Sequence, residues 1–234
     1  MSKDNTTPGF IDEGIIDVEP ETWQETEEFL KQMTDNLCKI KISNGLTGSG
    51  FFSKIPYPDE FHLLPVLITN NHVVNENDLE IGNIIQITLD DDKIKKEIII
   101  DKERKTYTSK EFDTTIIELR PNEDGINSFL DVNNQYSVKE DELTKIYANQ
   151  EIYIIHYPGG KEKSHSLGKI RKIIKGYIIC HSCSTKEGSS GAPILLRRKY
   201  KVIGVHKGKP ENFNYNHGIL IQFPIQEFNK GLID

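Results

Sequence analysis

Hydrophobic residues recur along this chain in short runs separated by Gly, Pro, Asn and Asp, from Leu37 to the C-terminus. Such runs, rich in Ile, Val, Leu and Thr, are typical of β-strands. Six precede residue 120: Cys38–Ile42, Thr47–Phe52, Leu64–Thr69, Ile84–Leu89, Lys95–Ile100 and Thr114–Leu119. Six follow it: Glu151–His156, Leu167–Ile174, Tyr177–His181, Ala192–Leu196, Lys201–Val205 and His217–Phe223. Because no long helices alternate with them, the pattern predicts an all-β barrel fold, not α/β.

Helical patterns occur only near the two ends. After a polar arm over residues 1–20, the segment Glu21–Met33 places Trp23, Phe29, Leu30 and Met33 on one helical stripe, with acids in its first turns. We expect this helix to brace the barrels, or alternatively to contact a regulatory partner. The segment Ile225–Lys230 predicts a short closing helix.

One loop carries the pattern of a nucleophile. In the segment Thr185–Pro193, Ser190 lies between Gly188 and Gly191. A serine hydroxyl needs an adjacent base, and the oxyanion it creates needs backbone N–H donors. The glycines let the backbone curl so that the N–H groups of Gly188 and Ser190 point into one oxyanion hole. The base must come from elsewhere in the chain.

Two residues upstream complete this chemistry. His72 follows an apolar strand, and Asp113 stands at the start of another. An imidazole can take the Ser190 proton and return it to the leaving amine, while a carboxylate fixes the imidazole tautomer. Each residue alone would be a surface histidine, a strand cap or a turn serine. Their order and their places at strand ends together predict a Ser-His-Asp triad.

These motifs resemble the trypsin-like, chymotrypsin-fold serine peptidases, in particular the compact branch that includes bacterial glutamyl endopeptidases. The resemblance runs from Leu37 to the C-terminus and depends on Thr69–Val74, Phe112–Asp113, Gly188–Pro193 and Val202–His206. It implies two six-stranded antiparallel β-barrels. The expected division is an arm and helix over 1–36, a first barrel over 37–125 with His72 and Asp113, and a second barrel over 126–234 with Ser190.

Ser189 departs from the family pattern. Trypsin-like zymogens keep an aspartate just before the nucleophile, and this aspartate pairs with a newly cut N-terminus. A serine cannot form that ion pair. We therefore expect the oxyanion hole to form without N-terminal processing.

Four positions are expected to form the S1 specificity pocket: Ser184, Thr185, His206 and Gly208. The resemblance to glutamyl endopeptidases implies that Thr185 and His206 bind a P1 carboxylate, with charge assistance if the histidine is protonated. A neutral Ser184, where enzymes for basic P1 residues carry aspartate, argues against Lys or Arg specificity. The resulting prediction is cleavage after Glu or Asp. The rival prediction is a small apolar P1 preference, with His206 as a structural histidine.

The other histidines and the cysteines are interpreted as structural. His156 and His181 lie in predicted strands without an evident acidic partner. Cys38, Cys180 and Cys183 are too few for a disulfide framework and are expected to be free thiols. Cys180–Cys183 could form one corner of a metal site, but a structural zinc needs four ligands. We expect no metal and no cofactor.

Charge and composition narrow the partners. The 234 residues carry a formal net charge of −7, which disfavours nucleic acid and anionic membranes as partners. No apolar signal segment is evident at Met1, so a cytoplasmic location is expected. The predicted substrate is an extended protein segment that pairs with the backbone of Val205 to Lys207. The alternatives are a non-catalytic peptide-binding barrel, a heat-shock-type quality-control protease, and a fragment of a larger protein.

Overall fold

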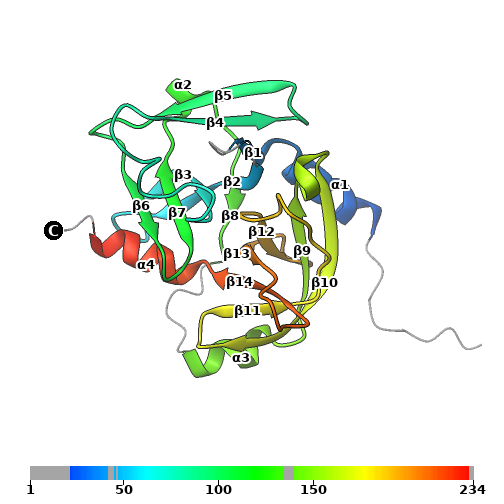
Figure 1. Ribbon diagram of the computed structural model, residues 1–234. Coiled ribbons are helices and arrows are strands. Elements are labelled where there is room, and N and C mark those ends of the chain that lie inside the picture. The colour runs from blue at the N-terminus through cyan, green and yellow to red at the C-terminus, as the bar shows by residue number, and fades with distance from the viewer. Residues whose placement is uncertain (1–21, 42–44, 46, 134–139, 232–234) are drawn as a thin grey trace, which may run out of the picture.

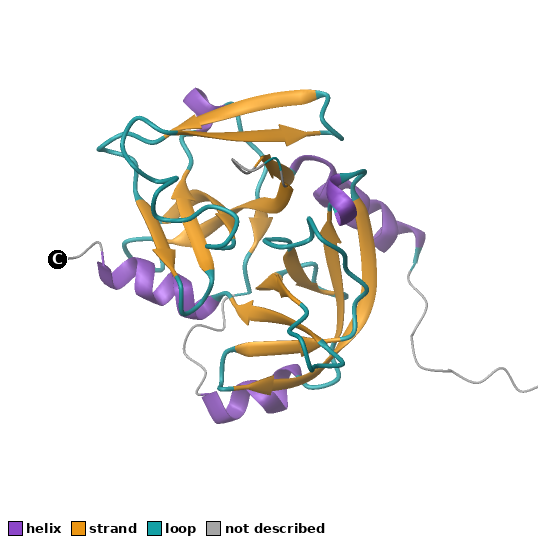
Figure 2. Cartoon of the chain, in the orientation of Figure 1, coloured by secondary structure: helices purple, strands orange, loops and turns teal. Residues whose placement is uncertain are grey.

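The structure is a computed structural model that describes residues 22–41, 45, 47–133 and 140–231. The chain forms a curled β-sheet and a closed β-barrel that lie against each other, with helices at the periphery (Figures 1 and 2). The predicted all-β fold is therefore confirmed. The turn-rich tract from Pro121 to about Asp141, which the sequence predicts to connect the two barrels, falls partly on residues 134–139, outside the described residues.

Eight strands form the first sheet. In the order β5-β4-β1-β2-β3-β7-β6 they pair antiparallel, and β8 pairs parallel with β2. Their bounds are β1 Leu37–Lys41, β2 Thr47–Pro56, β3 Leu63–Thr69, β4 Ile84–Leu89, β5 Ile94–Ile99, β6 Thr106–Ser109, β7 Thr114–Glu118 and β8 Leu130–Asp131. This sheet curls as a half-barrel instead of the closed six-stranded barrel that was predicted.

The second unit is a closed six-stranded barrel in the order β10-β11-β14-β13-β12-β9. Its strands are β9 Glu151–His156, β10 Ser164–Ile174, β11 Ile178–His181, β12 Pro193–Leu196, β13 Val202–Gly208 and β14 Asn216–Leu220. The predicted last strand is too long, because β14 ends at Leu220 and a helix begins at Gln222.

In the described part of the chain, five helical segments surround the strands: α1 Trp23–Asp35, α2 Pro121–Asp124, α3 Glu140–Tyr147, the 3-10 turn η1 Pro158–Gly160, and α4 Gln222–Gly231. The predicted N-terminal and C-terminal helices are present as α1 and α4. Strands β6 and β8 and helix α3 were not predicted. β6 and β8 are only four and two residues long, which is too short for a clear strand pattern.

Helix α1 begins with a capping box. Thr22 Oγ accepts the N–H of Glu25 at 3.2 Å, and the Glu25 carboxylate accepts the N–H of Thr22 at 2.7 Å. Phe29 and Met33 are buried, and the ring centroids of Phe29 and of Tyr153 in the barrel lie 4.5 Å apart. α1 therefore covers part of the barrel.

The predicted apolar stripe of α1 is only half correct. Trp23 is 77% exposed and Leu30 is 54% exposed. The buried face is set by Phe29 and Met33, because these two side chains contact the barrel. A regulatory partner that contacts the exposed apolar residues of α1 remains a prediction.

The largest hydrophobic core joins the two units. Phe51 and Ile68 of the sheet belong to the same buried cluster as Leu195 and Val205 of the barrel and Phe228 of α4. Burial at roughly 25 cal/mol per Å² of apolar surface makes this seam a main source of stability. The two units are therefore held in a fixed relation, which a site at their boundary requires.

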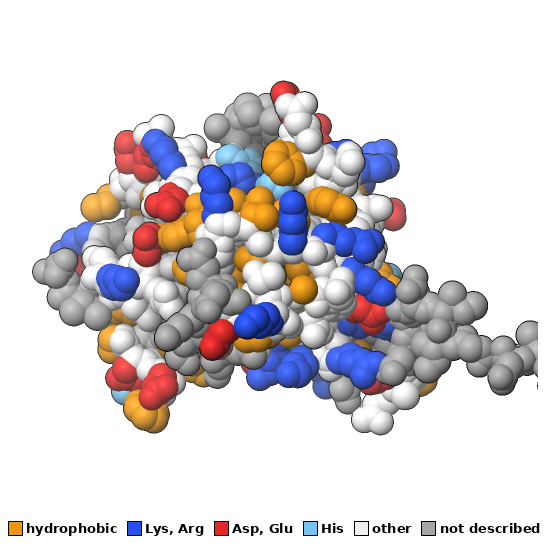
Figure 3. All heavy atoms as spheres, turned by 90° about the horizontal axis from the view of Figure 1, so that it is seen from below, with side chains coloured by type: hydrophobic (Ala, Val, Ile, Leu, Met, Phe, Trp, Pro, Cys, Tyr) orange, Lys and Arg blue, Asp and Glu red, His pale blue; other side chains and the backbone are white. Residues whose placement is uncertain are grey.

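The molecular surface carries both charges unevenly. On the face seen from below, where α3 and β11 lie, Lys and Arg side chains spread over much of the surface around a few apolar ones (Figure 3). The formal net charge of −7 therefore does not describe every face. Within the described part of the chain, no helix is both long and apolar enough to cross a membrane.

Candidate active site

His72 and Asp113 meet at the edge of the first sheet. Nδ1 of His72 lies 2.8 Å from Oδ2 and 3.0 Å from Oδ1 of Asp113. The backbone N–H of His72 also donates to Oδ1 at 3.0 Å. β3 and β7 are antiparallel neighbours, so the turn after β3 and the start of β7 lie at one edge. The structure thus brings together two residues that are 41 positions apart in sequence.

Asp113 is held in a demanding conformation. Its φ of +45° lies in the left-handed region that few non-glycine residues adopt. Asn70 Nδ2 donates to its carbonyl oxygen at 2.8 Å, which helps to fix this backbone. Burial alone would raise the pKa of the Asp113 carboxyl, but the hydrogen bond and charge of His72 and the charge of Lys207 hold it below its usual value. Asp113 therefore carries a negative charge next to the imidazole.

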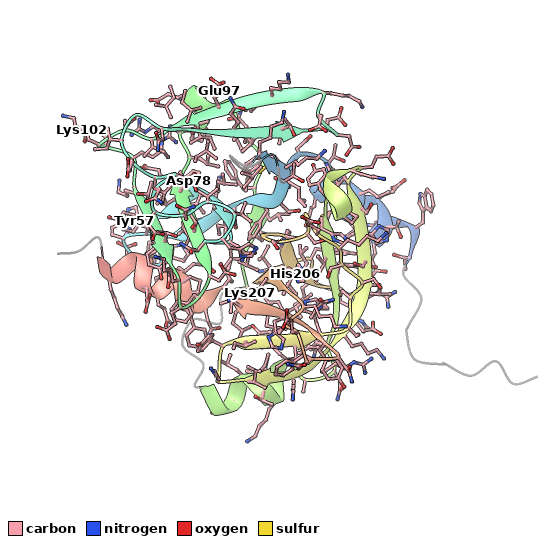
Figure 4. All side chains as sticks on the ribbon, in the orientation of Figure 1. Tyr57, Asp78, Glu97, Lys102, His206 and Lys207 are labelled. Atoms are coloured by element: carbon pink, nitrogen blue, oxygen red, sulfur yellow. The ribbon has the colours of Figure 1, made fainter. Side chains whose placement is uncertain are left out.

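Lys207 is a further neighbour of this carboxylate. Its Nζ lies 3.4 Å from Asp113 Oδ2, and its side chain is 44% exposed. Lys207 and His206 are adjacent on β13, near the centre of the molecule, where the barrel faces the first sheet (Figure 4). The lysine charge is thus directed toward Asp113 and is not simply solvated.

Ser190 comes from the loop before β12. Its Oγ donates to the carbonyl oxygen of Lys207 at 3.2 Å. All three residues are described by the structure, and Ser190 forms no hydrogen bond with the His72 imidazole. The Ser190 hydroxyl is therefore directed at Lys207 and not at His72.

Gly191 allows the two units to come into contact beside Ser190. Its φ is +88°, and a Cβ at this position would overlap the carbonyl oxygen of Ser49 and the hydroxyl of Thr69, both in the first sheet. The Gly191 N–H donates to the carbonyl of His206 at 2.9 Å, and the Ser49 N–H donates to the carbonyl of Ser190 at 2.8 Å. Ser190 is therefore fixed from both sides.

The orientation of the peptide between Glu187 and Gly188 is fixed by one hydrogen bond. The Glu187 carbonyl accepts the N–H of Gly159 at 2.6 Å, so it points toward the segment after β9. In a trans peptide the N–H of Gly188 points the opposite way. Gly188 adopts φ +86°. Among the described residues, neither this N–H nor that of Ser190 has an acceptor.

A pocket of about 550 Å³ opens beside Ser190. All four residues predicted for S1 line it, namely Ser184, Thr185, His206 and Gly208. The other lining residues are His181, Ser182, Cys183, Lys186, Glu187, Lys209, Asn214, Tyr215 and Asn216. The pocket therefore combines hydroxyl, imidazole and amide groups with two lysines and one glutamate.

A pair of histidines lies at the pocket. His181 Nε2 is 3.2 Å from His206 Nδ1, and both residues are buried. Burial, with the charges of His181, His156 and His72, lowers the pKa of His206 well below its usual value. Burial, with the charge of His217, likewise lowers the pKa of His181 to about 3. Both rings are therefore neutral in the unbound protein near pH 7.

His181 is the residue whose environment sequence reasoning missed. Its neighbour is another histidine from a different strand, and not an acid. β11 and β13 pair with opposite edges of β14, so His181 and His206 meet across this strand. The sequence signal was a histidine in each of several barrel strands, namely β9, β10, β11, β13 and β14, and this does not predict register.

The three cysteines are buried free thiols, as predicted. Cys183 is one of the residues that line the pocket, and burial raises the pKa of its thiol to about 12. A protonated, buried thiol is a poor nucleophile. Ser190 is therefore the better candidate for attack on a substrate.

The comparison with protein families decides the class. Residues 48–205 match the trypsin-like peptidase domain. The chain belongs to the trypsin-like peptidase family. This trypsin-like peptidase has no match among curated protein sequences.

Three solved structures share the fold. A serine endoprotease from Yersinia pestis aligns with a TM-score of 0.63 at 12% identity, over 93% of this chain and 69% of that one. The protease Rv3671c from M. tuberculosis H37Rv, in an inactive form, aligns with a TM-score of 0.60 at 17% identity, over 93% and 98% of the two chains. Deg5 aligns with 0.58 at 17% identity, over 87% and 91%. At these identities the likeness establishes the fold alone.

Proposed function

We propose that this trypsin-like peptidase is a serine endopeptidase in which Ser190 is the nucleophile, His72 the general base and Asp113 the residue that orients the base. The observation that carries the proposal is the hydrogen bond from His72 Nδ1 to Asp113, beside the pocket that Ser190 lines. It places the carboxylate where it fixes the tautomer and stabilises the imidazolium.

The proposed reaction follows from the groups in place. An extended substrate pairs with the backbone of β13 near Lys207 and competes for the carbonyl that now accepts the Ser190 hydroxyl. The freed hydroxyl turns to His72, which takes its proton as Ser190 attacks the substrate carbonyl. The N–H groups of Gly188 and Ser190 stabilise the oxyanion. His72 then gives the proton to the leaving amine.

We further propose that the pocket prefers Glu or Asp at P1. Support comes from the hydroxyls of Ser184 and Thr185 and the imidazole of His206, which line one pocket and can all donate to a carboxylate. Because His206 is neutral in the unbound protein, it would bind the carboxylate as a neutral donor or take up a proton on binding. The rival is a small apolar P1 preference, with His206 and His181 as a buried polar pair.

A matched substrate panel tests both levels of the proposal. Peptides that differ only in Glu, Gln, Ala or Val at P1 would be compared by kcat/KM, with Ser190→Ala as the inactive control. We expect kcat/KM for the Glu peptide to exceed that for the isosteric Gln peptide by about tenfold to hundredfold, because charge-assisted hydrogen bonds contribute about 1.5–3 kcal/mol. Faster turnover of Ala or Val than of Glu would overturn the acidic preference.

Fluorophosphonate labelling separates an enzyme from a peptide-binding barrel. The probe reacts only with an activated serine, so we expect it to label the unchanged protein and not the Ser190→Ala variant. His72→Ala should also lose labelling, because the base activates the hydroxyl. Absence of labelling in the unchanged, folded protein would favour a non-catalytic barrel.

A further inference from the structure

Ser189, the residue before the proposed nucleophile, is fully buried with its hydroxyl between two neighbours. Its Oγ lies 2.7 Å from Nδ1 of His156 on β9 and 3.1 Å from the backbone nitrogen of Lys186. His156 is 3% exposed. Among the described residues that line the pocket, neither Ser189 nor His156 appears. Their contact therefore acts beneath the site and not on the substrate.

The direction of these hydrogen bonds follows from Ser166. Ser166 donates its single hydroxyl proton to the Ser184 carbonyl at 2.6 Å, so its oxygen accepts from His156 Nε2 at 3.4 Å. His156 therefore carries its proton on Nε2, and Nδ1 accepts from the Ser189 hydroxyl. Ser189 Oγ in turn accepts the Lys186 N–H. One imidazole thus links both ends of the segment 184–189.

This arrangement requires a neutral imidazole, because Nδ1 must accept. Burial, with the charge of His165, lowers the pKa of His156 to about 4. His156 is therefore neutral near pH 7. The same β9 region also contacts the loop through its backbone, since the Gly159 N–H donates to the Glu187 carbonyl.

We propose that His156 and Ser189 are positioning residues whose hydrogen bond holds residues 186–190 in the conformation that presents the Gly188 and Ser190 amides to an oxyanion. The inference rests on the proposed serine peptidase function. It explains how this loop is fixed although no aspartate precedes the nucleophile. The two partners come from β9 and from the loop itself, so no cut N-terminus is needed.

Three substitutions test the proposal by separating kcat from KM. Ser189→Ala and His156→Leu should each lower kcat about tenfold to hundredfold, because each leaves a buried polar partner unsatisfied and lets the loop move. KM should change less than about threefold. His156→Asn, whose side-chain oxygen can accept from Ser189, should recover most of kcat. The Ser189→Ala/His156→Leu double variant should be no slower than the slower single variant.

A buried serine far from the site gives a matched control. Ser53 is fully buried, and its Oγ donates to the Leu130 carbonyl at 2.7 Å in the first sheet. Ser53→Ala should lower the melting temperature but leave kcat of the folded enzyme unchanged. Circular dichroism would confirm that every variant is folded at the assay temperature.

The outcomes distinguish this inference from the function on which it rests. Full activity in Ser190→Ala would refute the proposed nucleophile. If Ser190→Ala is inactive but Ser189→Ala and His156→Leu keep the kcat of the unchanged enzyme, the positioning role alone is wrong. A double variant whose loss equals the product of the two single losses would also overturn it, because the residues would then act independently.

Discussion

Replacement of Gly188 by alanine tests the oxyanion hole directly. Gly188 has φ +86°, and an added Cβ would lie 2.6 Å from the carbonyl oxygen of Tyr157 and 2.8 Å from the nitrogen of Gly160. Both neighbours are backbone atoms that cannot rotate away. We expect the peptide between Glu187 and Gly188 to turn instead, which breaks the 2.6 Å bond from the Gly159 N–H and removes the Gly188 N–H from the hole.

The two costs of this substitution have different sizes. A left-handed φ costs an alanine about 1–2 kcal/mol, and this cost lowers the free energy of unfolding. Loss of one oxyanion donor costs about 3–4 kcal/mol of transition-state stabilisation. At about 1.36 kcal/mol per factor of ten, we expect kcat to fall by about 100-fold to 1000-fold. KM should change little, because the donor acts mainly in the transition state.

Gly82→Ala is the matched control for the backbone strain. Gly82 has φ +97°, and nothing lies within 4 Å of an added Cβ. The Gly82→Ala variant should therefore have a free energy of unfolding lower by about 1–2 kcal/mol and an unchanged kcat. Initial rates and urea unfolding of both variants would be measured at the same temperature. A folded Gly188→Ala enzyme with a kcat within threefold of the Gly82→Ala control would refute Gly188 as an oxyanion donor.

Two further predictions concern stability. Arg104 and Asp124 form a bidentate ion pair at 2.9 and 3.0 Å with both side chains buried. Asp124→Ala leaves the arginine charge unpaired, so it should lower the free energy of unfolding in urea by about 3–5 kcal/mol. A decrease below about 1 kcal/mol would contradict this. Burial, with the charge of His165, lowers the pKa of His156 from 6.5 to about 4, so below pH 6.5 the unfolded chain binds the proton first and stability falls until about pH 4. His156→Asn should flatten this part of the pH–stability curve, and an unchanged slope would show that other groups cause it.

Much of the fold could be predicted from local patterns because strands are short and bounded by turn residues. Runs such as Leu64–Thr69 and Glu151–His156 correspond closely to β3 and β9. That the first sheet stays open could not be predicted, because closure depends on pairing between distant strands. The same limit explains why β8, only two residues long, was missed.

The candidate site shows a similar division. The order of His72, Asp113 and Ser190 predicted which residues would be near each other, and His72 and Asp113 do form a hydrogen bond. The direction of the Lys207 side chain and the pairing of His181 with His206 could not be predicted. Both depend on the register of β13 against its neighbours, which a single sequence does not specify.

The geometry of the site depends on both folded units at once, because the nucleophile loop is held mainly by backbone groups from each. Ser49 of the first sheet donates its N–H to the Ser190 carbonyl at 2.8 Å and its hydroxyl to the Gly188 carbonyl at 2.8 Å. The same hydroxyl accepts the Tyr157 N–H at 3.2 Å, next to the end of β9. One small side chain thus connects three segments. A larger residue at position 49 is expected to disturb these three contacts, so the seam between the units helps to set the position of Ser190.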